Sequence, residues 1–359
     1  MCDPVSSCKL KIRSQIDNAL KSLGLTDTAE YSVEYSAISA YGDFSSNVSF
    51  VYSKYTDVST HELSVLLAEK LKDDTLFDSV SVAQHGFINF VMVSDWYKQA
   101  LSEALNMGKK FGNNYMPSDN AMIITVDDPK ISKEDLSLFR NEAVTIALQA
   151  VLEMNGYSVI RKKADSAAVD HKCRTIVCAP AKYWDSGKVP SDLSDVSEHV
   201  VTSECFFQSS GSVWDERFVL LLNELKPQTP ISVDNITPAK TIYDYAWVCS
   251  LLRSFDRDPG FSAKNSMVIP NIPQERLLTK NILLFPSVIS KASLDLDPSG
   301  VLRYLSSLVS DLRSLRDEYG RSIGLNAAKS ESLYHYVSLV KQVFRNGMNL
   351  FCDEPDEYL

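Results

Sequence analysis

Residues 298–315, Pro-Ser-Gly-Val-Leu-Arg-Tyr-Leu-Ser-Ser-Leu-Val-Ser-Asp-Leu-Arg-Ser-Leu, form the most regular stretch of the sequence. Their apolar residues recur every three or four positions in one continuous stripe, which predicts an amphipathic helix. Asp297 and Pro298 are suited to the N-cap and the first helical position. Residues 243–255, 274–291 and 330–351 also carry apolar residues near helical spacing. We therefore predict an antiparallel helical bundle over residues 238–359.

The sequence of the preceding part of the chain, residues 118–237, predicts a strand, a loop, a helix and a second strand. A strand is expected at Met122-Ile-Ile-Thr-Val, a helix over 135–154 and a second strand at Tyr157-Ser-Val-Ile. Gly156 stands where a helix C-terminus needs a left-handed residue. With a further apolar strand over 174–179, this region predicts a small, incomplete parallel α/β layer.

The first part of the chain, residues 1–117, contains both helical and strand patterns of apolar residues. Helices are expected over 9–23 and around Leu63 to Leu71, and strands over 31–35, 80–83 and 87–93. An α+β domain is the expected result. The segment 42–47 reads as a capped turn.

Composition and charge indicate which classes of protein this sequence can belong to. The chain has 359 residues, 45% of them hydrophobic and 23% charged, and no apolar run long enough to span a membrane. Its seven cysteines are scattered without a Cys-x-x-Cys pair, which favours reduced thiols in the cytoplasm. A net charge of −10 argues against a protein that coats nucleic acid indiscriminately. Residues 300–350 nevertheless carry seven bases against four acids, either as a solvated helix surface or as a phosphate-binding face.

Searches for catalytic and metal motifs find none. The sequence has no glycine-rich phosphate loop, no Gly-x-Gly-x-x-Gly and no His-Glu-x-x-His. His171, Cys173 and Cys178 lack a fourth ligand at a usual spacing, so no metal is expected. We expect no cofactor and no catalytic residue.

Several segments resemble, in order, blocks of the arginyl-tRNA synthetase family. They are Tyr41-Gly-Asp-Phe-Ser-Ser-Asn-Val-Ser-Phe50, Val82-Ala-Gln-His-Gly-Phe-Ile-Asn-Phe90, Val126-Asp-Asp-Pro-Lys-Ile-Ser-Lys-Glu134 and the helix at Tyr243-Asp-Tyr-Ala-Trp-Val-Cys-Ser-Leu-Leu-Arg253. The resemblance implies an α/β and all-α multidomain fold. Its parts are an N-terminal elbow-binding-like domain (1–117), a degenerate, shortened Rossmann-like domain (118–237) and a DALR anticodon-binding-like helical bundle (238–359).

The departures from the family predict a loss of catalysis. The family's His-x-Gly-His loop, whose imidazoles stabilise charge on ATP, would fall where this chain has Lys133-Glu-Asp-Leu-Ser-Leu-Phe-Arg140. The middle region is also short for a catalytic domain. The sequence therefore predicts a protein that is not an enzyme.

The resemblance implies two contacts with tRNA. Family positions that touch the tRNA elbow correspond to Gln84, Phe87 and Asn89, where an aromatic ring can stack on a splayed base and an amide can bind its edge. The alternative is that Phe87 is a core residue. In the bundle, Arg313 and Arg316 are three apart and can both face a phosphate backbone, although the family's aromatic residue is missing there.

Taken together, these features predict a non-catalytic, cytoplasmic tRNA-binding protein without a DNA or membrane partner. In its layout the chain is also similar to catalytically inactive paralogues of the family, of the type called DALR anticodon-binding domain-containing proteins. That resemblance implies that it presents arginine tRNA to a partner tRNA methyltransferase of the 3-methylcytidine type, or to another protein partner. The alternatives are a structural component of a large assembly such as an organellar ribosome, or a degenerate synthetase with a regulatory role.

Overall fold

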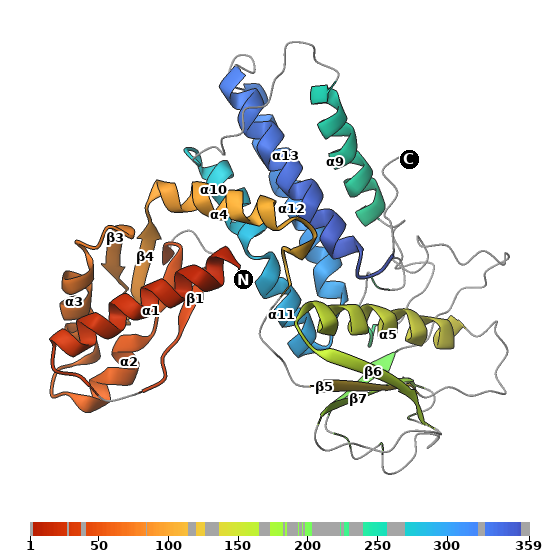
Figure 1. Cartoon of the computed structure of the whole chain (residues 1–359), viewed down its shortest axis with the longest axis horizontal. Helices are drawn as coiled ribbons and strands as arrows, with labels where there is room; N and C mark the ends of the chain where they lie inside the picture. Colours follow the sequence, from red (N-terminus) through yellow and green to blue (C-terminus); the bar gives the residue numbers. More distant parts are fainter. Residues whose placement is uncertain are drawn as a thin grey trace. The chain divides into compact units, whose positions relative to one another are not determined.

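The chain divides into two compact units in the computed structural model (Figure 1). The first comprises Met1–Gly108, Ser262–Leu284 and Asp311–Leu339, and the second comprises Lys109–Phe261, Phe285–Ser310 and Val340–Leu359. The structure describes residues 3–26, 29–36, 41–83, 85–113, 120–125, 136–164, 173–181, 184, 193, 196, 198–202, 223, 226–229, 240–256, 270–321 and 327–352.

The first unit contains a four-stranded antiparallel sheet of order β1-β2-β4-β3. Residues of one face, such as Phe44, Ile88 and Phe90, are fully buried, because alternate residues of a strand point to opposite faces. Helices α1, α3 and α4 supply further core side chains. The elements are α1 (Pro4–Ser22), β1 (Val33–Tyr35), β2 (Phe44–Ser46), α2 (Val48–Tyr52), the 3-10 turn η2 (Ser53–Tyr55), α3 (Thr60–Leu71), β3 (Phe77–Val82), β4 (Ile88–Met92), α4 (Ser94–Met107) and α10 (Pro273–Leu283).

The N-terminal part differs from expectation in two places. The capped turn expected over 42–47 is a turn only at Gly42, which has φ +71°, and the chain then forms β2. Helix α4 was not predicted, although its buried residues Trp96, Ala100 and Ala104 recur every four positions. That spacing is a helical signal that can be recognised in the sequence.

The second unit contains a four-stranded sheet of order β6-β5-β7-β8 in which every neighbouring pair is parallel. The expected parallel α/β layer is therefore confirmed. The 3-10 turn η3 (Gly108–Lys110) spans the boundary between the two units. The elements of the second unit are β5 (Asn120–Thr125), α5 (Leu136–Met154), β6 (Ser158–Lys163), β7 (Arg174–Pro180), β8 (Glu198–Thr202), α9 (Lys240–Asp256) and α11 (Phe285–Asp295).

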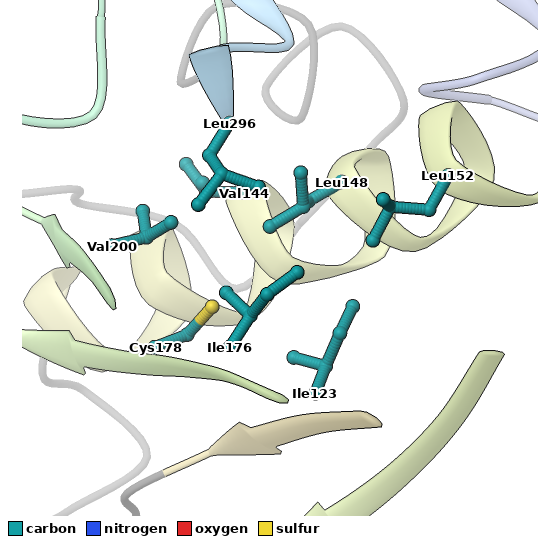
Figure 2. Packing of buried hydrophobic residues seen from close by; sticks show 8 residues of the cluster. All are labelled: Ile123, Val144, Leu148, Leu152, Ile176, Cys178, Val200 and Leu296. Carbon is teal, nitrogen blue, oxygen red and sulfur yellow. The ribbon is translucent and has the colours of Figure 1, made fainter. Parts of the chain in front are cut away.

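Both faces of the central strands β5 and β7 are buried. Ile123 of β5 and Ile176 of β7 pack on Val144, Leu148 and Leu152 of α5, with Leu296 beside them (Figure 2). The alternate residues Met122, Ile124 and Val177 belong to a separate cluster on the other face. Helix α5 ends as the sequence predicts, because Gly156 has φ +95° and the Tyr157 N–H bonds to the Leu152 carbonyl at 3.0 Å.

The last two helices are α12 (Ser299–Arg321) and α13 (Ala327–Met348). The apolar stripe of α12 is fully buried at Leu305, Leu308, Val309, Leu312 and Leu315, which confirms the predicted helical C-terminal part. One prediction is corrected. The helix expected over 274–291 is two helices, since α10 ends at Leu283 and α11 begins at Phe285. Pro286 has no N–H to donate to the carbonyl of residue 282, and its ring crowds that carbonyl.

The predicted boundaries at 117 and 237 stay predictions, because residues 114–119 and 230–239 lie outside the described part. No helix in the described part is long and apolar enough to cross a bilayer. The cytoplasmic location stays a prediction.

Candidate nucleic-acid interface

The first predicted contact lies at the tip of the β3–β4 hairpin. The Ala83 N–H bonds to the Phe87 carbonyl and the Gly86 N–H bonds to the Ala83 carbonyl, both at 2.9 Å. Gly86 has φ +87°, and a Cβ there would lie 2.9 Å from the Thr60 methyl group. The tight turn therefore needs glycine, and it sets the position of the next residue, Phe87.

Phe87 is not a core residue, because 41% of its surface is exposed. Its ring packs against Phe50 of α2, with centroids 4.9 Å apart and planes tilted by 56°. The ring is thus held from one side and open to solvent on part of its surface. This arrangement suits stacking on a planar ligand. Sequence reasoning had not singled out Phe50, although it closes the Tyr41–Phe50 block.

Asn89 lies two residues further along β4 and so projects from the same face of the sheet as Phe87. Its side chain is only 7% exposed, and its Oδ1 accepts a hydrogen bond from Ser45 Oγ at 2.8 Å. Ser45 and Ser81 are its cross-strand neighbours in β2 and β3. The structure therefore places Asn89 in a polar row across the sheet beneath the hairpin tip. Gln84 lies outside the described residues.

The second predicted contact lies on α12. Arg313 is half-buried and Arg316 is exposed, and each follows a fully buried leucine of the stripe, Leu312 or Leu315. Arg303, one of the seven bases counted in this region, bonds to Asp297 at 3.0 Å and to Ser299 at 2.5 Å. Arg313 and Arg316 belong to the same compact unit as Phe87 and Asn89.

A buried polar cluster supports the helix that carries these arginines. Glu275 of α10 accepts hydrogen bonds from the hydroxyls of Tyr319 and Ser332, the latter at 2.9 Å, and from the Asn271 N–H at 2.7 Å. Burial raises the pKa of Tyr319, and the hydrogen bond to Glu275 raises it further. The cluster ties α10, α12 and α13 together within the first unit, one helical turn beyond Arg316.

The described residues include no group of three or more His, Cys, Asp or Glu side chains placed to hold a metal ion. The two candidate contacts offer an aromatic ring with amide and hydroxyl groups at the hairpin, and two guanidinium groups on α12. Such groups bind by stacking, hydrogen bonding and charge, which are the interactions by which proteins recognise single-stranded bases and phosphates.

Comparison with known families identifies both ends of the chain. Residues 10–92 match the family described as arginyl tRNA synthetase N terminal domain, and residues 241–353 match the DALR anticodon binding domain. The arginine–tRNA ligase of Staphylococcus carnosus is 27% identical over 161 residues, covering 44% of this chain and 29% of that protein. The ligase of Brucella anthropi is 28% identical over 189 residues, covering 51% of this chain and 32% of that protein.

Solved structures show the same fold. The arginyl-tRNA synthetase of Plasmodium falciparum superposes with a TM-score of 0.68 at 12% identity, covering 98% of this chain and 99% of that chain. The Thermus thermophilus arginyl-tRNA synthetase gives a TM-score of 0.62 at 11% identity, covering 98% of this chain and 100% of that chain. These likenesses confirm the predicted fold class, and at such identities they concern the fold alone.

The comparisons contradict the prediction that the chain is not an enzyme. The relatives are named as ligases, which are enzymes. The prediction rested mainly on the residue types of one loop, and residues 126–135 lie outside the described part of the structure. It was wrong to conclude so much from one loop, because charge in a transition state can be stabilised by any suitably placed donor that the fold brings to the site.

The chain spans about a third of the length of the curated relatives it matches. Within that span the two family matches lie where the motifs predicted them, one over the N-terminal sheet and one over the C-terminal helices. This chain is therefore similar to arginyl-tRNA synthetases at both ends, with residues 10–92 matching their N-terminal domain and residues 241–353 matching a DALR anticodon-binding domain.

Proposed function

We propose that this protein binds arginine tRNA through the hairpin tip at Phe87 and through the α12 arginines, and presents it to a partner tRNA-modifying enzyme of the 3-methylcytidine methyltransferase type. The observation that carries the proposal is the half-exposed ring of Phe87, supported on one side by Phe50. A ring that is held on one side and open on the other offers a flat surface on which an unpaired base can stack.

In this proposal tRNA is recognised by two kinds of contact, base stacking and phosphate binding. Stacking on Phe87 acts on an unpaired base and depends little on salt. Arg313 and Arg316 are suited to phosphate oxygens, which position the RNA without reading its sequence. In this proposal Asn89 orients the edge of the stacked base, with its Oδ1 held by Ser45.

Presentation to a partner enzyme requires only that tRNA and enzyme be bound at once. The partner then encounters its substrate at an effective concentration set by the complex rather than by the solution. Selectivity for arginine tRNA would come from this chain, and the methyl transfer from the partner.

The test of tRNA recognition is an affinity series at several salt concentrations. Arginine tRNA should bind more tightly than an unrelated tRNA at every salt concentration, and both affinities should fall as salt rises, because phosphate contacts release counterions. Equal affinity for the two tRNAs across the series would refute selective recognition.

The partner is tested separately in cells. Deleting the chain should lower 3-methylcytidine in arginine tRNAs and leave it unchanged in other tRNAs that carry this base. Restoring the wild-type chain should restore the modification, whereas the Phe87→Ala variant should restore less of it. Unchanged modification after deletion would contradict the presentation role and leave tRNA binding to be judged by the affinity series.

A further inference from the structure

A buried ion pair joins the N-terminal sheet to α10 inside the first unit. Lys280 Nζ lies 3.2 Å from Asp43 Oδ1, and the two side chains are 4% and 2% exposed. The same ammonium group donates a hydrogen bond to the Gly42 carbonyl at 2.5 Å. The partners are more than two hundred residues apart in the sequence, so only the fold brings them together.

Asp43 is also bound by the sheet and by α4. Its Oδ2 accepts hydrogen bonds from the Met92 N–H at 2.8 Å and from the Tyr97 hydroxyl at 2.5 Å. Burial raises the pKa of Tyr97 well above its usual value, and the charge of Asp43 adds to that effect. The carboxylate therefore has partners on both oxygens, from the end of β4, from α4 and from α10.

The contacts continue from Lys280 toward the α12 arginines. The adjacent residue, Asn281, donates a hydrogen bond from its side-chain amide to Asp311 at 2.6 Å. Asp311 lies two positions before Arg313. At the other end, Met92 closes the strand that begins just after Phe87. These side-chain contacts, joined by the backbones of β4, α10 and α12, thus connect the two surfaces to which RNA binding is assigned.

A buried ion pair of this kind adds little to stability compared with an apolar pair of the same shape, and in some proteins such pairs instead fix one arrangement of their partners. Resting on the proposed function, we propose that the Asp43–Lys280 ion pair is a positioning clamp. It fixes the N-terminal sheet on α10, so that one tRNA engages Phe87 and the α12 arginines at the same time. Neither residue needs to touch the RNA.

The test uses the double variant Asp43→Asn with Lys280→Met, because removing one partner alone leaves an uncompensated buried charge. The Asp43→Asn change keeps a carbonyl oxygen for the Met92 N–H and the Tyr97 hydroxyl, and the Lys280→Met change keeps an unbranched stem of similar length. The matched control is Lys291→Met with Asp295→Asn, which removes an exposed ion pair of 2.8 Å on α11.

Two RNAs are compared, a whole arginine tRNA transcript and its isolated anticodon stem-loop. We expect the clamp variant to lose about tenfold or more in affinity for the whole tRNA, and less than about twofold for the stem-loop, because only the whole tRNA gains from binding two surfaces at once. Amide exchange in α4 and α10 should also quicken, whereas exchange in β5 should not. The control variant should match the wild type in every measurement.

The outcomes separate the two proposals. Equal losses for both RNAs would show that the pair merely supports a local binding surface, and the clamp would be refuted. Unchanged tRNA affinity in a folded double variant would also refute the clamp and leave the proposed function standing. A wild-type chain that binds neither RNA would refute the proposed function, and the role of the clamp in it as well.

Discussion

The rings of Phe87 and Phe50 lie with their centroids 4.9 Å apart at a tilt of 56°, and Phe87 remains 41% exposed. This contact fixes the orientation of a ring that would otherwise rotate freely at a hairpin tip. The exposure decides between the two interpretations of Phe87 in favour of a surface residue, because a core aromatic such as Phe90 is fully buried.

Replacing Phe87 by alanine should weaken arginine tRNA binding by about 1–3 kcal/mol, the usual contribution of one base stacked on an aromatic ring. The loss should change little between low and high salt. Titrations at two salt concentrations measure it, and Leu66→Ala is the control, since it removes an exposed apolar side chain from α3 of the same unit. Full affinity in a folded Phe87→Ala protein would rule out stacking at the hairpin tip. The thermal midpoint must be recorded beside each titration.

Replacing both Arg313 and Arg316 by alanine should weaken every tRNA by a similar factor. The slope of log affinity against log salt should become shallower by about one per lost phosphate contact. Arg303→Ala on the same helix is the control, because Arg303 is engaged with Asp297 and Ser299. A selective loss for arginine tRNA alone, with an unchanged slope, would mean that these side chains read bases.

Gly42→Ala should destabilise the chain more than Gly24→Ala does. Both glycines have positive φ, +71° and +79°, which costs an alanine about 1–2 kcal/mol. A Cβ at Gly42 would also lie 2.6 Å from the Phe90 carbonyl oxygen, whereas one at Gly24 would meet no atom within 4 Å. The clash should add about 1–3 kcal/mol, measured by urea unfolding. An equal loss of unfolding free energy at the two positions would show that β4 shifts to make room for the added methyl group.

Because the Cys178 thiol is buried, we expect the free energy of unfolding to fall at alkaline pH. Burial raises its pKa from 9.0 to about 12, so above pH 9 the thiol ionises in the unfolded chain but not in the folded one. A raised pKa contributes stability that is lost as pH rises, here by about 1.4 kcal/mol between pH 8 and pH 10.

Cys178→Ala should therefore lose less stability than the wild type over that pH interval, although its cavity lowers stability at both pH values. Val177→Ala, at the neighbouring fully buried position, is the control and should lose as much over the interval as the wild type does. The measurement is the free energy of unfolding in urea at each pH. An identical pH dependence in Cys178→Ala would contradict the assignment.

Where helices and strands form was largely decided by local sequence. The stripe of α12 and the Gly156 terminus of α5 were predictable because side-chain spacing and one left-handed residue are sufficient to specify them. The break between α10 and α11 was predictable in principle, since Pro286 forbids a continuous helix by itself. The order of strands in the first sheet was not, because β2 has only three residues and carries almost no periodic signal.

The sequence by itself determined the residue types of the candidate interface: an aromatic ring and an amide two positions apart on a strand, and two arginines beside an apolar stripe. Only the tertiary structure decided that Phe87 is exposed while Asn89 is covered and bound to Ser45, because exposure depends on neighbours supplied by β2, β3 and α2. It also decided that Lys280 meets Asp43, since the free energy of a buried charge depends on a partner that no local pattern of residues can identify.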